Sequence, residues 1–222
     1  MLRRALQIII TFGIWAGLLF IAAGTWDWPR AWILVGLMVL TLAVNFVLVA
    51  RFNPRIAEAR SKVRKGTKGW DKVLMPVYAF FYLAFPVLAG LDAVRFGWTS
   101  LPDALVYPGA FLYIMGAALI DWVLVTNPFL EQTVRIQTER GHKVVTTGPY
   151  ALVRHPMYCG LMIQYLGLPL LLGSAWSLLG TLAVIAIFAV RTAKEDKTLE
   201  AELEGYADYK QKTKWRLLMG VW

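Results

Sequence analysis

The sequence predicts an all-α protein: a polytopic transmembrane helix bundle of five to six spans with a cytoplasmic C-terminal amphipathic helix. Three observations predict this class. The chain of 222 residues is 58% hydrophobic, which is more than an ordinary soluble domain contains. Its apolar residues form blocks close to the roughly 20 residues that cross a bilayer as a helix. Its basic residues gather in alternate connections between those blocks, as they do in membrane proteins.

Four apolar blocks are long enough to span a membrane. They are Leu6–Thr25, Ala31–Ala50, Val73–Leu91 and Leu105–Thr126. Two shorter blocks, Met157–Leu172 and Ala175–Val190, meet at Gly173 and Ser174, which predicts a tight helical hairpin. We therefore expect six spans, or five if part of the hairpin does not cross fully.

The net charge of +9 is distributed so that it sets the topology. If the spans alternate, every lysine and arginine except Arg30 and Arg95 lies on one face of the membrane. This positive-inside pattern predicts cytoplasmic termini, and the same side chains can contact anionic membrane lipids. The basic connection Arg51–Lys72, which includes Lys62 and Arg64, is either a solvated loop or a lid over a site. Because the basic residues are spread over four segments, nucleic-acid binding is not expected.

Two predicted spans contain a polar residue. Asn45 is expected to hydrogen-bond a neighbouring helix. Asp121 is costly in a bilayer and should face the bundle or a cavity near the cytoplasmic end. A functional role and simple packing both stay open for Asp121. On the opposite face, Asp92 and Arg95 are close enough for an exposed ion pair, to which we assign no function.

The stretch Gly148–Gly160, with the sequence GPYALVRHPMYCG, opens the fifth span. Proline suits the first turn of a helix, and a residue before proline is biased away from helical geometry. A helix is therefore expected to begin at Pro156, with Arg154 and His155 at its mouth. The N–H groups of such a helix end attract anions.

The predicted hairpin returns the chain to the face of the membrane that it left. His155 and Glu195 are therefore expected at the ends of adjacent antiparallel helices, with Asp196 beside them. The segment Lys194–Lys210 has apolar residues at helical spacing and predicts the amphipathic C-terminal helix. Four tyrosines belong to the same region: Tyr150, Tyr158, Tyr206 and Tyr209.

These residue types suit a ligand that carries one anion and two cations. The anion would bind Arg154 and the helix mouth, an ammonium group would bind Glu195 or Asp196, and a further cation would lie on a tyrosine face. S-adenosylmethionine carries these groups as a carboxylate, an ammonium and a sulfonium. Spacing alone does not identify the ligand.

The motif RHPxYxG at 154–160, followed one hairpin later by an acidic pair, resembles the signature of the isoprenylcysteine carboxyl methyltransferase family. Phospholipid methyltransferases have a related version. The tripeptide GPY at 148–150 and the segment 202–209 are similar to bacterial members. The resemblance is specific over Asn127–Trp222 and looser before it. Asp196 stands where glutamate is common, and its shorter side chain leaves its partner open.

The resemblance implies an integral membrane enzyme, in a bacterial inner membrane, that takes S-adenosylmethionine from the cytoplasm and a lipophilic acceptor from the bilayer. It divides the chain into a four-span membrane bundle at 1–126 and a catalytic region at 127–222. The residues expected to be catalytic are Arg154, His155 and Glu195. The residues expected to bind the cofactor are Gln137, His142, Gly148, Pro149, Tyr150, His155, Pro156, Tyr158, Gly160, Glu195 and Asp196.

Two other kinds of site are not expected. No glycine cluster follows a predicted strand, so the doubly wound fold of soluble methyltransferases is excluded. His142, His155 and Cys159 do not have a recognisable metal-ligand spacing.

The sequence leaves the acceptor open. A carboxylate acceptor needs no base at neutral pH, whereas an amine or thiol must first lose a proton. No base stands out, although His142 or His155 would serve, and this favours a carboxylate. The alternatives are a phospholipid N-methyltransferase or a methyltransferase of another small lipophilic acceptor, a membrane reductase with a similar bundle, and a non-catalytic membrane protein that keeps the fold.

Overall fold

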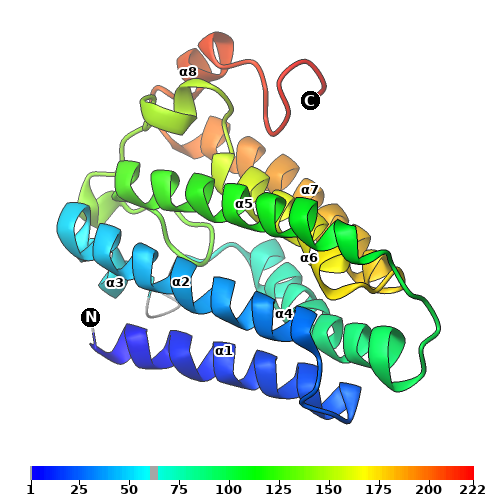
Figure 1. The fold of residues 1–222 in the computed structure, drawn as a ribbon. Helices are drawn as coiled ribbons and strands as arrows, with labels where there is room; N and C mark the ends of the chain where they lie inside the picture. Colours follow the sequence, from blue (N-terminus) through cyan, green and yellow to red (C-terminus); the bar gives the residue numbers. More distant parts are fainter. Residues whose placement is uncertain (1, 61–64) are drawn as a thin grey trace.

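The computed structural model describes residues 2–60 and 65–222, and every regular element in those ranges is helical. The long helices are α1 (Leu2–Ala23), α2 (Pro29–Phe52), α4 (Gly69–Gly90), α5 (Val106–Thr126), α6 (Pro156–Leu172) and α7 (Ser177–Glu202). The short ones are α3 (Pro54–Ala59), α8 (Tyr206–Lys212) and the turns η1 (Leu91–Arg95), η2 (Asp103–Leu105), η3 (Thr138–Arg140) and η4 (Gly148–Ala151). Figure 1 shows the long helices side by side, with α8 and the C-terminal segment beyond one end of them.

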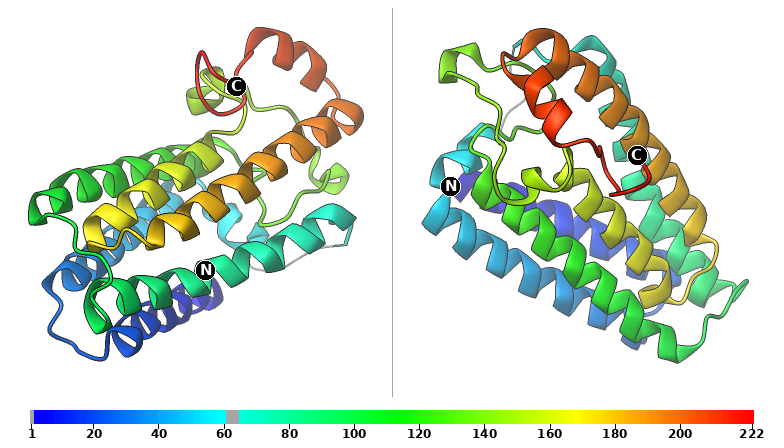
Figure 2. Two further views of the ribbon diagram at one scale, coloured as in Figure 1. Left: turned by 90° about the vertical axis from the view of Figure 1, so that its right-hand side faces the viewer. Right: turned by 90° about the horizontal axis from the view of Figure 1, so that it is seen from above.

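Five of the long helices are long and apolar enough to cross a membrane, and α6 is a shorter apolar helix of 17 residues. The predicted all-α polytopic bundle of five to six spans is therefore confirmed, and the protein is a multi-pass integral membrane protein. Helix α6 lies within the bundle, against α5 and α7 (Figure 2), and more than half of its residues are buried. At about 1.5 Å per residue it is about 26 Å long.

The hairpin between α6 and α7 is fixed by a buried carboxylate at the far end of the bundle. Gly173 ends α6 with a left-handed φ of 78°. Asp92 accepts hydrogen bonds from the Ser174 hydroxyl at 2.6 Å and from the Trp176 backbone N–H at 3.1 Å. Asp92 also accepts from Thr99 and is completely buried. The expectation of an exposed ion pair between Asp92 and Arg95 is therefore wrong, because Asp92 holds the hairpin turn instead.

The predicted C-terminal helix over Lys194–Lys210 does not form as one unit. Helix α7 continues without a break from the bundle to Glu202. The chain then turns at Gly205, whose φ of 81° is left-handed, and α8 begins at Tyr206. The turn brings the apolar side chains of Tyr206 and Tyr209 onto Tyr150 in a second core cluster, separate from the bundle core. This cluster closes the end of the bundle where the predicted site lies.

The connection between α2 and α4 is partly ordered against the bundle. Helix α3 buries Ile56, and the Asn53 amide donates to the backbone oxygen of Leu124 at 2.8 Å. Lys62 and Arg64 lie outside the described residues, so whether this connection is a lid stays open.

Glycines allow α5 and α6 to approach each other closely. A Cβ added to Gly116 would lie 2.5 Å from the backbone oxygen of Gly160, and a Cβ added to Gly167 would lie 2.5 Å from that of Gly109. Small residues at such interfaces let helix backbones pack directly in a membrane. The same contact fixes α6, and with it the residues at its start, against α5.

We expect Gly116→Ala to destabilise the protein by about 1–3 kcal/mol, because the added methyl group forces two backbones apart. The loss should appear as a lower unfolding temperature in detergent. Gly36→Ala is the matched control, since a Cβ there meets nothing within 4 Å. Equal unfolding temperatures for the two variants would show that the α5–α6 contact is not tight.

Candidate active site

A cavity of about 1190 Å³ runs from the inside of the bundle to the segments that close its end. Its membrane-embedded part is lined mainly by apolar side chains of α1, α2, α5 and α6, including Phe12, Met38 and Leu161. Its outer part is lined by the 127–147 segment, the start of α6, the end of α7 and α8. One continuous space therefore joins an apolar region to a polar region.

Tyr158 and Glu195 form the polar contact at this junction. The Tyr158 hydroxyl donates to a carboxylate oxygen of Glu195, and this bond links α6 to α7 as the predicted hairpin requires. His155 lies parallel to the Tyr158 ring, with ring centres 5.9 Å apart. The Arg191 guanidinium lies 5.4 Å from the centre of the same ring. All four side chains line the cavity.

Arg191 is held by a buried carboxylate at the start of α4. Its Nε lies 3.0 Å from Asp71 Oδ1, and its Nη2 donates to the Gln132 backbone oxygen at 2.8 Å. Asp71 also accepts from the Val134 backbone N–H at 2.7 Å. The Asp71–Arg191 pair thus fastens the 127–147 segment to α4 and α7. This pair was not predicted, although Arg191 lies one helical turn before Glu195 on the same helix.

The 127–147 segment is folded around Gln137. The Gln137 amide donates to the Phe129 backbone oxygen, and Arg140 donates to the Gln137 side-chain oxygen at 2.5 Å. His142 packs on Phe129 with ring centres 4.8 Å apart. Burial, together with Arg140 and Arg135, lowers the pKa of His142 below its ordinary value. The imidazole of His142 is therefore neutral at pH 7 and presents a polar, uncharged edge to the cavity.

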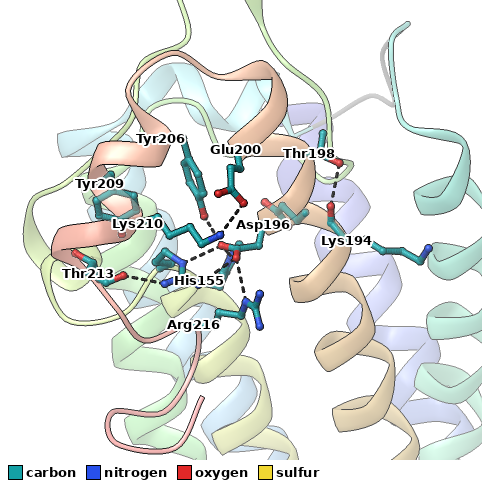
Figure 3. A network of polar contacts seen from close by, with 12 residues as sticks. His155, Lys194, Asp196, Thr198, Glu200, Tyr206, Tyr209, Lys210, Thr213 and Arg216 are labelled. Atoms are coloured by element: carbon teal, nitrogen blue, oxygen red, sulfur yellow. Dashed lines mark hydrogen bonds and ion pairs between the residues drawn. The ribbon is translucent and has the colours of Figure 1, made fainter.

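Asp196 is the centre of a buried network behind the cavity wall (Figure 3). Its oxygens accept from Arg154 Nε at 2.9 Å, from the Tyr206 hydroxyl at 2.8 Å and from Arg216 Nε at 3.0 Å. His155 Nε2 lies 3.3 Å from the same carboxylate. The network joins the start of α6, α7, α8 and the C-terminal segment.

Arg154 is fully engaged in this network. Besides Asp196, its guanidinium donates to the backbone oxygens of Thr213 at 2.9 Å and Lys214 at 2.6 Å. The backbone N–H groups of Arg154 and His155 donate to the backbone oxygens of Trp215 and Arg216. The C-terminal segment therefore covers the mouth of α6, where the sequence predicted a bound anion.

The predicted site residues fall into two groups. Those that line the cavity are Gln137, His142, Tyr150, Arg154, His155, Pro156, Tyr158 and Glu195. Those that lie behind its wall are Gly148, Pro149, Gly160 and Asp196. Gly148 turns the chain with a φ of 60°, and Gly160 packs against α5. Pro156 is the first residue of α6, and His155 precedes it outside the helix, as predicted.

This fold and site define a class: an integral membrane protein with a cavity that extends from among its spans to their polar end. The family model of the isoprenylcysteine carboxyl methyltransferase (ICMT) family matches residues 109–201. A "Probable protein-S-isoprenylcysteine O-methyltransferase" of Oryza sativa subsp. indica is 27% identical over 187 residues, 82% of this chain and 93% of that protein. Over residues 109–201 the chain is therefore similar to the isoprenylcysteine carboxyl methyltransferase family.

Two further proteins are similar to this chain. A protein-S-isoprenylcysteine O-methyltransferase of Schizosaccharomyces pombe is 37% identical over 102 residues, 45% of this chain and 42% of that protein. The solved structure of a eukaryotic intramembrane Ras methyltransferase of this family superposes with a TM-score of 0.55 and 20% identity, over 91% of this chain and 72% of that one. This structural likeness supports the fold.

Proposed function

We propose that this protein transfers a methyl group from S-adenosylmethionine, bound at the cytoplasmic end of the cavity, to a lipophilic acceptor that enters from the bilayer. The observation that carries the proposal is the continuity of the cavity across the Tyr158–Glu195 contact. A water-soluble donor and a membrane-soluble acceptor can react only in a cavity that both can enter. The relatives are named as proven or probable protein-S-isoprenylcysteine O-methyltransferases and the matching family model as a carboxyl methyltransferase, which supports a carboxylate as the accepting group.

The outer part of the cavity fits the methyl donor. Glu195 offers a carboxylate to an ammonium or sulfonium group, and the ring of Tyr150 offers further contact to a cation. Gln137 and the neutral His142 offer polar contacts to the uncharged part of the molecule. The donor supplies an activated methyl group, so the protein is left with the tasks of positioning and excluding water.

The membrane-embedded part of the cavity fits the acceptor's apolar chain. An acceptor chain lying there would bring its polar head to Tyr158 and Glu195. A carboxylate head is ionised at neutral pH and attacks without a base. We assign Arg154 and Asp196 a positioning role, because their contacts hold the C-terminal segment across the start of α6.

Purified full-length protein in detergent micelles is expected to bind S-adenosylmethionine in a calorimetric titration. With methyl-labelled donor and a total lipid extract from bacterial membranes, it is expected to yield a labelled lipid ester. Tyr158→Phe should weaken donor binding by about threefold to tenfold, since Glu195 loses one hydrogen bond.

The same assay separates the alternatives. A labelled phospholipid amine in place of an ester identifies a phospholipid N-methyltransferase. Binding of a nicotinamide cofactor would favour a reductase. If a folded sample shows neither donor binding nor label transfer, the proposal is contradicted and a non-catalytic protein is favoured.

A further inference from the structure

The segment that follows α8 ends in a turn of apolar side chains, residues 217–222, which we call the apolar turn. The backbone N–H groups of Arg216 and Leu217 donate to the Trp222 oxygen at 2.8 Å and 3.0 Å, so the chain folds back on itself. Gly220 allows this with a left-handed φ of 81°. A cluster of exposed apolar side chains marks an interaction surface. Those of the turn are Leu218 at 59%, Met219 at 63%, Val221 at 74% and Trp222 at 37% exposure.

The apolar turn lies beside the first turn of α6, where that helix enters the bundle. Leu217 is buried in the bundle core, and its backbone oxygen accepts from the Cys159 thiol at 2.9 Å. Cys159 is three residues inside α6 from Pro156, which corresponds to about 4.5 Å along the helix axis. The segment runs from α8 past His155 and along the side of the bundle (Figure 3). The exposed side chains of the turn are therefore level with the first lipid-facing turns of the spans.

The charges beside the apolar turn fit the headgroup region of an anionic membrane. Residues 209–222 contain four cations and no acidic residue. Two of these cations, Lys212 and Lys214, are exposed and lie just before the turn. Lysines near a membrane surface are attracted to anionic lipid heads, and tryptophans such as Trp215 and Trp222 prefer the same layer. Acyl chains against the turn and anionic heads against the lysines describe a lipid leaflet, which already surrounds the neighbouring spans.

The other side of the same segment holds the start of α6. The backbone N–H of Arg154 donates to the Trp215 oxygen, and that of His155 donates to the Arg216 oxygen, both at 2.9 Å. The Arg216 side chain also donates to Asp196 at 3.0 Å. The segment therefore has one face on the candidate site and an apolar face that the described residues leave exposed. Whatever covers the apolar face also steadies the start of α6.

We propose that the apolar turn inserts into the lipid leaflet at this end of the bundle, with Lys212 and Lys214 among anionic headgroups. The bilayer thereby holds the C-terminal segment across the start of α6. The spans fix the bundle in the membrane, whereas the turn fixes the segment that covers the candidate site. This membrane contact lies outside the spans, and it does not depend on the proposed function.

Lipid contact is measured on full-length protein in nanodiscs of phosphatidylcholine and phosphatidylglycerol, with one copy in each disc. An NBD fluorophore is attached at Met219→Cys, and the matched control carries it at Gln211→Cys, an exposed position of α8. Because the native Cys159 is buried, wild type treated in the same way measures any label there. We expect lipids with a nitroxide on their acyl chains to quench the first fluorophore at least about threefold and to leave the second unchanged.

A variant without a label tests what the contact does. Met219→Asp combined with Val221→Asp places charge in the turn, and charge is costly in the acyl-chain layer. Since both side chains are mostly exposed, the change removes few contacts within the protein. We expect trypsin to cut after Arg216 at least tenfold faster than in wild-type nanodiscs. Ala207→Asp combined with Gln211→Asp adds the same charge at exposed positions of α8 and should leave the cleavage rate unchanged.

Iodide, which stays in the water, supplies the opposing result. If iodide quenches the fluorophore at Met219→Cys as strongly as the one at Gln211→Cys, and nitroxide lipid quenches neither, the inference is overturned. A turn that is shielded from both quenchers only when two copies share a disc is covered by a second copy of the chain, which overturns it as well. Equal trypsin rates for the wild type and the Met219→Asp, Val221→Asp variant would show that the leaflet does not hold the segment. Failure of every sample to bind S-adenosylmethionine would count against the proposed function and leave the lipid quenching, and with it this inference, intact.

Discussion

Replacing Glu195 with glutamine is expected to weaken S-adenosylmethionine binding by tenfold or more, about 1.4 kcal/mol, and to lower methyl transfer by about 100-fold. Glu195 is the carboxylate that lines the junction of the cavity and accepts the Tyr158 hydroxyl. Glutamine keeps the shape of the side chain and can still accept that bond, but it removes the negative charge that faces the donor's cationic groups under the proposed function. Calorimetric titration and label transfer measure the two effects.

Glu200→Gln is the matched control for this variant. Glu200 lies on the same helix and carries the same charge, but it is exposed and pairs with Lys210 at the surface. An exposed pair of this kind contributes at most about 1 kcal/mol, so donor binding should not change. If the wild type and Glu195→Gln bind S-adenosylmethionine with equal affinity, the donor site does not include Glu195 of α7.

The membrane fold could be predicted because its signals are local. Blocks of apolar residues set the spans, and Pro156 set the start of α6. The hairpin logic also predicted that Glu195 meets the start of α6, where the structure places its bond to Tyr158. These inferences need only the length of a span and the direction in which it returns.

The contacts that complete the candidate site are long-range and have no periodic signal. Asp71 meets Arg191 across 120 positions of sequence, and Arg216 meets Asp196 through an irregular C-terminal segment. Hydropathy and spacing do not report such pairs. The break at Gly205 did have a local signal, because glycine commonly ends helices, but the apolar spacing across it favoured one continuous helix.

The stretch Gly148–Gly160, which contains the motif that resembles the family signature, likewise does not separate residues that reach the cavity from residues that support it. Gly148 and Gly160 belong to it for backbone reasons, a left-handed turn and a close approach to α5. Arg154 belongs to it because its guanidinium donates hydrogen bonds to Asp196 and to two backbone oxygens of the C-terminal segment. A motif records both roles in the same way, so the geometry is needed to tell them apart.

Asp196→Ala is expected to lower the free energy of unfolding by about 3–5 kcal/mol, because it leaves the buried guanidinium of Arg154 without its carboxylate partner. Arg154, His155 and Tyr206 are almost completely buried, and Arg216 is partly exposed. The loss of stability should be largest in α8 and the C-terminal segment, because the contacts of Asp196 hold both against the start of α6. Limited proteolysis should therefore cut after Glu202 at a protease concentration that leaves the wild type intact.

Asp208→Ala supplies the control, since Asp208 is an exposed acid on α8 and its loss should change stability by no more than about 0.5 kcal/mol. The comparison also separates positioning from ligand contact. Because Asp196 lies behind the cavity wall, Asp196→Ala should weaken donor binding only as far as the C-terminal segment loosens, and a saturating donor concentration should restore part of the lost stability. If Asp196→Ala instead abolished donor binding while the proteolysis pattern and unfolding temperature stayed those of the wild type, the carboxylate would have to contact the donor directly.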